Sequence, residues 1–149
     1  MSLTLLRHAA PLAIHRLPPT PANVSACTTA LLATPPAAFR SLTITAEEVS
    51  LILPSSTPVP RAYEVDSISH DDSVSSTKTE APWTAFQVAG TLDFSLVGIL
   101  AQLVAPVKKA EISVFVVSTF DTDWVLVKED MVARASEVWV HEGIAVEEA

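Results

Sequence analysis

The sequence is poor in the residues that build common catalytic loops and metal sites. Its 149 residues include only 3 glycines, 1 cysteine and 4 histidines. Neither a glycine-rich phosphate loop nor a nucleophile elbow is present, and so few glycines could not build one. His8, His15, His70 and His141 lack the spacing of metal ligands, and Cys27 has no neighbouring His or Lys to activate it. We therefore expect no cofactor, no metal ion and no enzyme activity.

Basic residues are also scarce. The 9 Lys and Arg are outnumbered by 17 Asp and Glu, and the resulting net charge of -8 argues against binding to a phosphate backbone. The longest apolar run, residues 96–107, is interrupted by Gln102 and Pro106 and is shorter than the roughly 18 to 20 residues of a membrane helix. The N-terminus lacks a signal-peptide pattern, and a single cysteine fits a reducing compartment. We expect a cytoplasmic protein without a nucleic-acid or membrane partner.

Apolar residues, by contrast, are abundant. They make up 49% of the chain against 17% charged residues, and 11 prolines indicate short, tightly turned segments. A chain of this length forms one ordinary domain or two small ones. So much apolar surface in small modules favours a buried interface, and we expect a homodimer.

A polar segment in the middle of the chain separates two patterned regions. Residues 66–80 consist mostly of Ser, Thr, Asp and His and offer little to bury, so we expect a flexible loop. A short strand or turn is expected at residues 59–65. The predicted organisation is an N-terminal module at 1–58, a linker with this insertion at 59–82, and a C-terminal module at 83–149.

The C-terminal region predicts the order strand, helix, strand, strand, helix, strand. A period of two over residues 83–89 indicates a strand that ends at Gly90, and Ser95 suits the N-cap of a helix whose last turn Pro106 should distort. Residues 112–118, apolar on both faces, suit a central strand, and residues 124–127 suit the next. A second helix opens at 128–130 and closes at Gly143, before a strand at 144–146. This βαββαβ order is that of a ferredoxin-like α+β unit.

The N-terminal region is a shorter version of the same pattern. It predicts a strand at 12–17, a helix at 22–33 with Pro21 near its start, and a hairpin of strands at 41–45 and 49–53. Residues 3–7 suggest an additional strand that pairs back on the following one through the turn at 9–11. The pattern reads βαββ and then stops.

Polar side chains of the C-terminal region concentrate in two places. One is the approach to the first helix, around Asp93 and Ser95, and the other is the turn at 118–123. Loops at one end of a sheet can form a common site. Asp121 and Asp123 have the DxD spacing of some metal-dependent sugar-nucleotide enzymes, but Asp and Thr are also common in turns because their side chains bond local amides.

The sequence of these segments resembles the ACT-domain family. Residues 91–101, 112–123 and 125–127 are similar to the second module of the members that include the CASTOR cytosolic arginine sensors, and residues 41–50 extend the resemblance to the first half. The resemblance implies two ACT-like modules in tandem, the first abbreviated, with a free amino acid bound at an interface between modules. The implied ligand-binding residues are Asp93, Ser95, Leu96, Gly98, Ile99, Leu100, Thr119, Phe120 and Asp123.

Physical chemistry supports part of this set. Amides at a helix start receive a carboxylate, Gly98 allows close approach, and Asp123 suits an ammonium group. Leu96 stands where the arginine sensors have an acidic residue, so arginine specificity should not be transferred. Three hypotheses remain open: an amino-acid-binding regulatory protein, a protein-interaction module with a vestigial pocket, and a small enzyme built on Asp121 and Asp123. The last has no accompanying base, nucleophile or cofactor motif.

Overall fold

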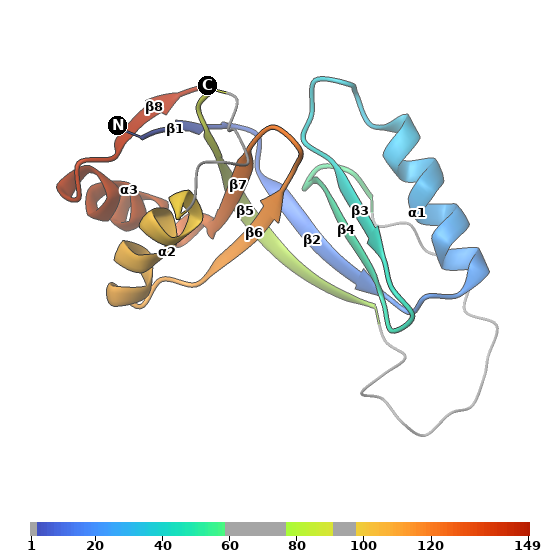
Figure 1. The fold of residues 1–149 in the computed structure, drawn as a ribbon. Helices are drawn as coiled ribbons and strands as arrows, with labels where there is room; N and C mark the ends of the chain where they lie inside the picture. The colour runs from blue at the N-terminus through green and yellow to red at the C-terminus, as the bar shows by residue number, and fades with distance from the viewer. Residues whose placement is uncertain (1–2, 59–76, 91–97) are drawn as a thin grey trace. The chain divides into compact units, whose positions relative to one another are not determined.

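The computed structural model describes residues 3–58, 77–90 and 98–149, shown in Figure 1. These residues form an α+β protein with eight strands and three α-helices. They divide into two compact units, which we call the C-terminal unit (the chain up to Pro11 together with Pro82–Ala149) and the N-terminal unit (Leu12–Ala81). This division differs from the predicted boundaries 1–58, 59–82 and 83–149, because the first strand groups with the C-terminal unit.

The C-terminal unit contains the predicted βαββαβ order. Its elements are β5 (Lys78–Val88, of which the part from Pro82 onward lies in this unit), α2 (Ile99–Lys109), β6 (Val114–Ser118), β7 (Asp123–Lys128), a single 3-10 turn (Glu129–Met131), α3 (Val132–His141) and β8 (Ala145–Glu148), preceded at the N-terminus by β1 (Thr4–Arg7). Helix α2 continues past Pro106 to Lys109, so the proline does not end it. Gly143 closes α3 with a φ of 82°.

The strands of this unit run in the order β6-β7-β5-β1-β8. Two predictions are wrong here. Strand β1 does not pair back on the next strand but lies antiparallel to β5 and parallel to β8, because Leu3 and Leu5 belong to this unit's core. Strand β6 is not central: among the described strands it pairs with β7, and Val125 to Val127 of β7 take the fully buried position.

Both helices pack on one face of this sheet, as Figure 1 shows for α2 and α3. Trp139 is the largest fully buried side chain. Its ring meets Phe86 edge-on with 4.9 Å between centroids, and its Nε1–H donates to the carbonyl oxygen of Leu103 at 2.9 Å. One side chain therefore joins α3, α2 and β5.

The N-terminal unit has the predicted βαββ elements. They are β2 (Leu12–Leu17), α1 (Pro21–Ala33), β3 (Ser41–Ile44) and β4 (Val49–Pro54), with strand order β3-β4-β2. Helix α1 packs on a core formed by Leu17, Cys27, Val49, Leu51 and Leu53. Cys27 is completely buried, and this burial raises the pKa of its thiol, in line with a structural rather than a reactive cysteine.

The predicted flexible segment is partly a strand. β5 begins at Lys78, inside the polar stretch 66–80, and Thr79 shares a hydrogen bond of 2.9 Å with Nδ1 of the buried His15. That partnership explains why a polar sequence is ordered here: a buried imidazole requires a polar contact.

The remainder of the predicted linker, including the strand or turn expected at 59–65, lies outside the described residues. None of the described helices has the length and apolarity of a membrane-spanning helix.

Candidate functional site

The candidate site begins with the hairpin turn between β6 and β7. The N–H of Thr119 donates to the carbonyl oxygen of Thr122 at 2.8 Å, and its hydroxyl donates to the same oxygen at 2.9 Å. The N–H of Thr122 in turn donates to Oγ1 of Thr119 at 3.3 Å. Thr119 is exposed, yet its hydroxyl is used inside the turn. The polar residues of this turn thus have the local structural role that their type favours.

A second hydrogen bond connects this turn to β5. Thr122 is 7% exposed, and its hydroxyl donates to the carbonyl oxygen of Val88 at 2.8 Å. Val88 is the last residue of β5, from which the chain passes toward α2. The turn and the start of the β5–α2 connection therefore lie at the same end of the unit's sheet. The helix-entry loop that the sequence predicts beside this turn lies outside the described residues, and the predicted ligand set did not include Thr122.

Asp123 lies at the base of the turn. It pairs across the hairpin with Ser118, whose hydroxyl donates to Oδ1 of Asp123 at 2.6 Å. The side chain is half-buried, so this carboxylate is held in one orientation and still reaches the surface. Ser118 was absent from the predicted ligand set, although its position opposite Asp123 follows from the length of the turn. An oriented carboxylate at a sheet end can accept hydrogen bonds from an ammonium group.

The tip of the turn is exposed. Phe120 is 80% exposed. Asp121 beside it is also exposed. In residues 3–58, 77–90 and 98–149, no group of three or more His, Cys, Asp or Glu side chains is arranged to hold a metal ion. The DxD spacing of Asp121 and Asp123 therefore gains no support as a metal site from the described residues.

The start of α2 supplies the second part of the candidate site. The helix begins at Ile99, and Gly98 occupies the N-cap position without a side-chain cap. Gly98 has a φ of 86°, and the space around its missing side chain is open, so the backbone conformation rather than a close approach requires glycine. Asp93, Ser95 and Leu96 lie outside the described residues, and so does the helix start predicted at Ser95.

The helix residues of the predicted set contribute unequally. Ile99 is 7% exposed and belongs to the core, so its side chain faces away from any ligand and only its backbone N–H is suited to binding. Leu100 is half-buried. Among the described residues no side chain caps this helix start, and backbone N–H groups at a helix start can receive a carboxylate.

A separate recess of about 380 Å³ lies along the C-terminal half of α2. Its lining residues include Gln102, Pro106, Lys109 and Glu142. None of them belongs to the turn at 119–122 or to the start of α2, so this recess is distinct from the candidate site. It is lined by a mixture of amide, charged and small apolar groups, which does not indicate a particular ligand.

Comparison with known families identifies the region that carries the candidate site. Residues 78–138 match the ACT domain. The match begins with β5, includes α2 and the turn between β6 and β7, and ends inside α3. The predicted resemblance is thus supported for this part of the chain. The relation to arginine sensors stays a prediction. No curated protein matches the sequence.

Solved structures share the fold over nearly the whole described chain. A protein from Agrobacterium tumefaciens is 23% identical, with a TM-score of 0.69 and coverage of 100% of this chain and 95% of the other. The regulatory subunit of aspartate kinase from Thermus flavus is 9% identical, with a TM-score of 0.65 and coverage of 95% and 99%. Aspartate kinase of Clostridium acetobutylicum, an allosteric enzyme, is 11% identical, with a TM-score of 0.63 and coverage of 93% of this chain and 34% of the enzyme.

Proposed function

We propose that this protein is a non-catalytic regulatory protein that binds a free amino acid through its ACT-like C-terminal unit and couples binding to assembly or to a protein partner. The observation that carries the proposal is the bond from Thr122 to the carbonyl oxygen of Val88, which holds the β6–β7 turn beside the start of the β5–α2 connection. Support comes from the ACT match over the same residues and from the regulatory character of the Thermus flavus relative.

The chemistry at this end of the sheet suits the two ends of an amino acid. Backbone N–H groups at the uncapped start of α2 suit its carboxylate, and the oriented carboxylate of Asp123 suits its ammonium group. The side chain would then lie near Phe120, which favours an apolar or neutral ligand over a cationic one. We further propose that a second copy of the chain completes the site with its own ACT module, so that the working form is a homodimer.

A thermal-shift screen of the twenty standard L-amino acids at millimolar concentration tests the proposal. A ligand that binds the folded state stabilises it, by about 2.7 kcal/mol at a hundredfold excess over the dissociation constant. We expect a rise in melting temperature for at least one amino acid, and loss of that rise in Asp123→Ala. The charge-matched control is Glu47→Ala, which removes an exposed carboxylate from the other unit. If no amino acid raises the melting temperature or gives calorimetric heat, the proposal fails.

One observation favours the alternative of a protein-interaction module with a vestigial pocket. Phe120 is 80% exposed at the tip of the turn, where a partner protein could contact its ring. Analytical ultracentrifugation separates the two functions. An amino-acid sensor changes its monomer–dimer equilibrium when the ligand is added, whereas a pure interaction module sediments identically with and without it.

A further inference from the structure

The hairpins of the two units have the same backbone. In the N-terminal unit, β3 and β4 pair up to Ile44 and Val49, and in the C-terminal unit β6 and β7 pair up to Ser118 and Asp123, with equal turns between them. Thr45 repeats the bonds of Thr119: its N–H donates to the carbonyl oxygen of Glu48 at 2.9 Å, and its Oγ1 accepts the N–H of Glu48 at 3.1 Å. The two turns can therefore be compared position by position.

The base of the turn differs completely between the units. In the C-terminal unit the pair is Ser118 and Asp123, joined by a hydrogen bond of 2.6 Å. In the N-terminal unit the equivalent pair is Ile44 and Val49, and Val49 is completely buried. The carboxylate suited to an ammonium group is thus replaced by a methyl-bearing side chain that is part of the core.

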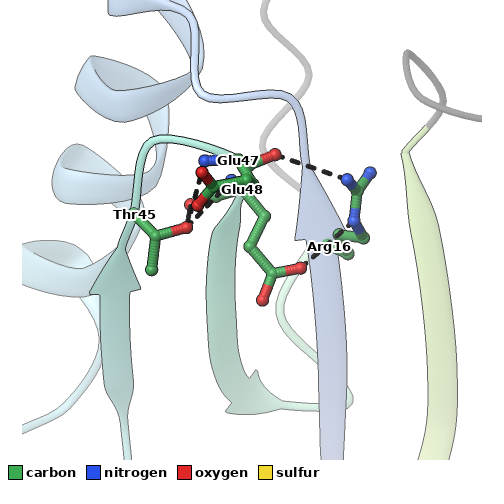
Figure 2. A network of polar contacts seen from close by, with 4 residues as sticks. All are labelled: Arg16, Thr45, Glu47 and Glu48. Atoms are coloured by element: carbon green, nitrogen blue, oxygen red, sulfur yellow. Dashed lines mark hydrogen bonds and ion pairs between the residues drawn. The ribbon is translucent and has the colours of Figure 1, made fainter.

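The last turn residue also differs. Thr122 of the C-terminal unit donates to the end of β5, whereas its equivalent, Glu48, accepts from Nε of Arg16 on β2 at 3.2 Å. Figure 2 shows Arg16 reaching across to this turn, where its Nη2 also donates to the carbonyl oxygen of Glu47 at 3.4 Å. Of the two acidic side chains at the N-terminal turn, that of Glu48 is therefore already paired with a cation of the same unit.

The starts of α1 and α2 also differ, in how they are capped. Thr20 caps α1, because its side chain accepts the N–H of Asn23 at 3.2 Å, and Pro21 removes a further N–H group. Asn23 also donates its side-chain amide to the carbonyl oxygen of Pro18 at 2.8 Å. At α2, Gly98 provides no side-chain cap. A ligand carboxylate would have to displace existing bonds at α1, whereas among the described residues no side chain caps the start of α2.

We infer that the chain binds one amino acid, at the C-terminal unit. The N-terminal unit has a hairpin of the same backbone, but its own side chains occupy the position that is equivalent to the binding site. This inference rests on the proposed function and adds to it the location and the number of sites per chain. One group could still receive a carboxylate in the N-terminal unit: Nη1 of Arg16 is buried and has no hydrogen-bond partner among the described residues. The test therefore includes Arg16.

Isothermal titration calorimetry on the full chain tests the inference, with each amino acid that gives a thermal shift as the titrant. We expect one molecule bound per chain. The double substitution Ser118→Ile with Asp123→Val, which gives the C-terminal turn the base of the N-terminal one, should weaken binding at least tenfold. Arg16→Gln and Glu48→Gln should each leave stoichiometry and affinity within about twofold of the unmodified chain.

The possible results are distinguishable. Two molecules per chain, unchanged binding in the double variant, or loss of binding in Arg16→Gln would each overturn the inference while leaving amino-acid binding itself established. Absence of heat for every amino acid with the unmodified chain would overturn the proposed function, and the inference with it. Should the double variant not fold, as judged by circular dichroism, Asp123→Asn replaces it, because that change keeps the shape of the side chain and removes its charge.

Discussion

Where the C-terminal unit has Phe86, the N-terminal unit has His15. Strand pairing establishes the equivalence: Phe86 faces Val125 on β7, and His15 faces Leu51 on β4, each at the same distance from its hairpin. Both side chains are buried, at 0% and 1% exposure. Phe86 contacts Trp139 of α3, whereas His15 bonds to Thr79. The same backbone position thus holds an aromatic contact in one unit and a polar contact in the other.

The comparison shows how one βαββ backbone supports different chemistry. A threonine at the first turn position and a set of backbone bonds define both hairpins, so the other turn positions are free to vary. In the C-terminal unit these positions carry an oriented carboxylate and an exposed aromatic ring. In the N-terminal unit they carry the core side chain of Val49, the exposed side chain of Ile44 and an ion pair. A fold likeness alone would have given both units the same function.

The largest expected effect comes from the aromatic contact that the C-terminal unit alone possesses. Trp139→Ala removes the largest fully buried side chain and its hydrogen bond to Leu103, and should lower the free energy of unfolding by about 3–5 kcal/mol. Urea denaturation followed by circular dichroism measures the loss. The control is Val140→Ala on the same helix, where the side chain is 58% exposed and the expected change is within about 0.5 kcal/mol. Equal losses in the two variants would contradict the assigned core.

An intermediate effect is expected from the residues that fasten the two turns. Thr122→Val keeps the side-chain shape but removes the buried bond to Val88, and should cost about 1–3 kcal/mol in the free energy of unfolding. Thr122→Ser should recover most of this loss. Thr45→Val removes exposed bonds that water can replace, so its cost should be smaller. A larger cost for Thr45→Val than for Thr122→Val would show that the two turns are not fastened as described.

The smallest effect concerns pH and the position of His15. Burial lowers the pKa of His15 below its ordinary value of 6.5, so the unfolded chain binds a proton more readily than the folded one. The stability associated with neutral His15 is therefore complete above pH 6.5 and is lost as the pH falls toward the lowered folded-state pKa. Among the described elements around it, α1, β3 and β4 contain no acidic side chain, whereas β5, whose Thr79 bonds to His15, carries Glu80 next to Thr79.

Unfolding by urea at a series of pH values above and below 6.5 measures this dependence. His15→Phe, which introduces the residue of the equivalent position, should flatten the profile in this range. The control is His141→Gln, which removes an imidazole from the other unit whose side chain is 88% exposed. A profile that is unchanged in His15→Phe would assign the dependence to other groups.

Most secondary structure was predictable because it depends on local patterns. Residues close together in the sequence show the period of two in β5, the helical spacing in α2 and α3, and the βαββ run from Leu12 to Pro54. Partners are not. β1 contains two consecutive leucines that fit many sheet positions, and its place between β5 and β8 goes with the core around Trp139, to which Leu5 belongs. The apolar sequence of β6 fitted a central strand, yet in the described sheet it lies beside β7 alone.

The candidate site was likewise only partly predictable from the sequence. Sequence identified the polar turn, and the resemblance to ACT domains named Thr119, Phe120 and Asp123. It did not identify Thr122, whose role depends on a carbonyl group more than thirty residues earlier in the chain. Nor did it show that the side chain of Ile99 faces the core. Hydrogen bonds between distant residues leave no periodic trace in a sequence, so only the fold reveals them.

The sequence by itself determined the composition of the elements: which segments form strands, which form helices, and where threonine, aspartate and glycine produce turns, because these depend on steric and hydrogen-bonding preferences within a few residues. The tertiary structure decided which strands pair, which of two similar hairpins has an available carboxylate, and where a polar strand start finds its partner in His15. Those outcomes depend on burial and on groups far apart in the chain, which come together only when the core forms.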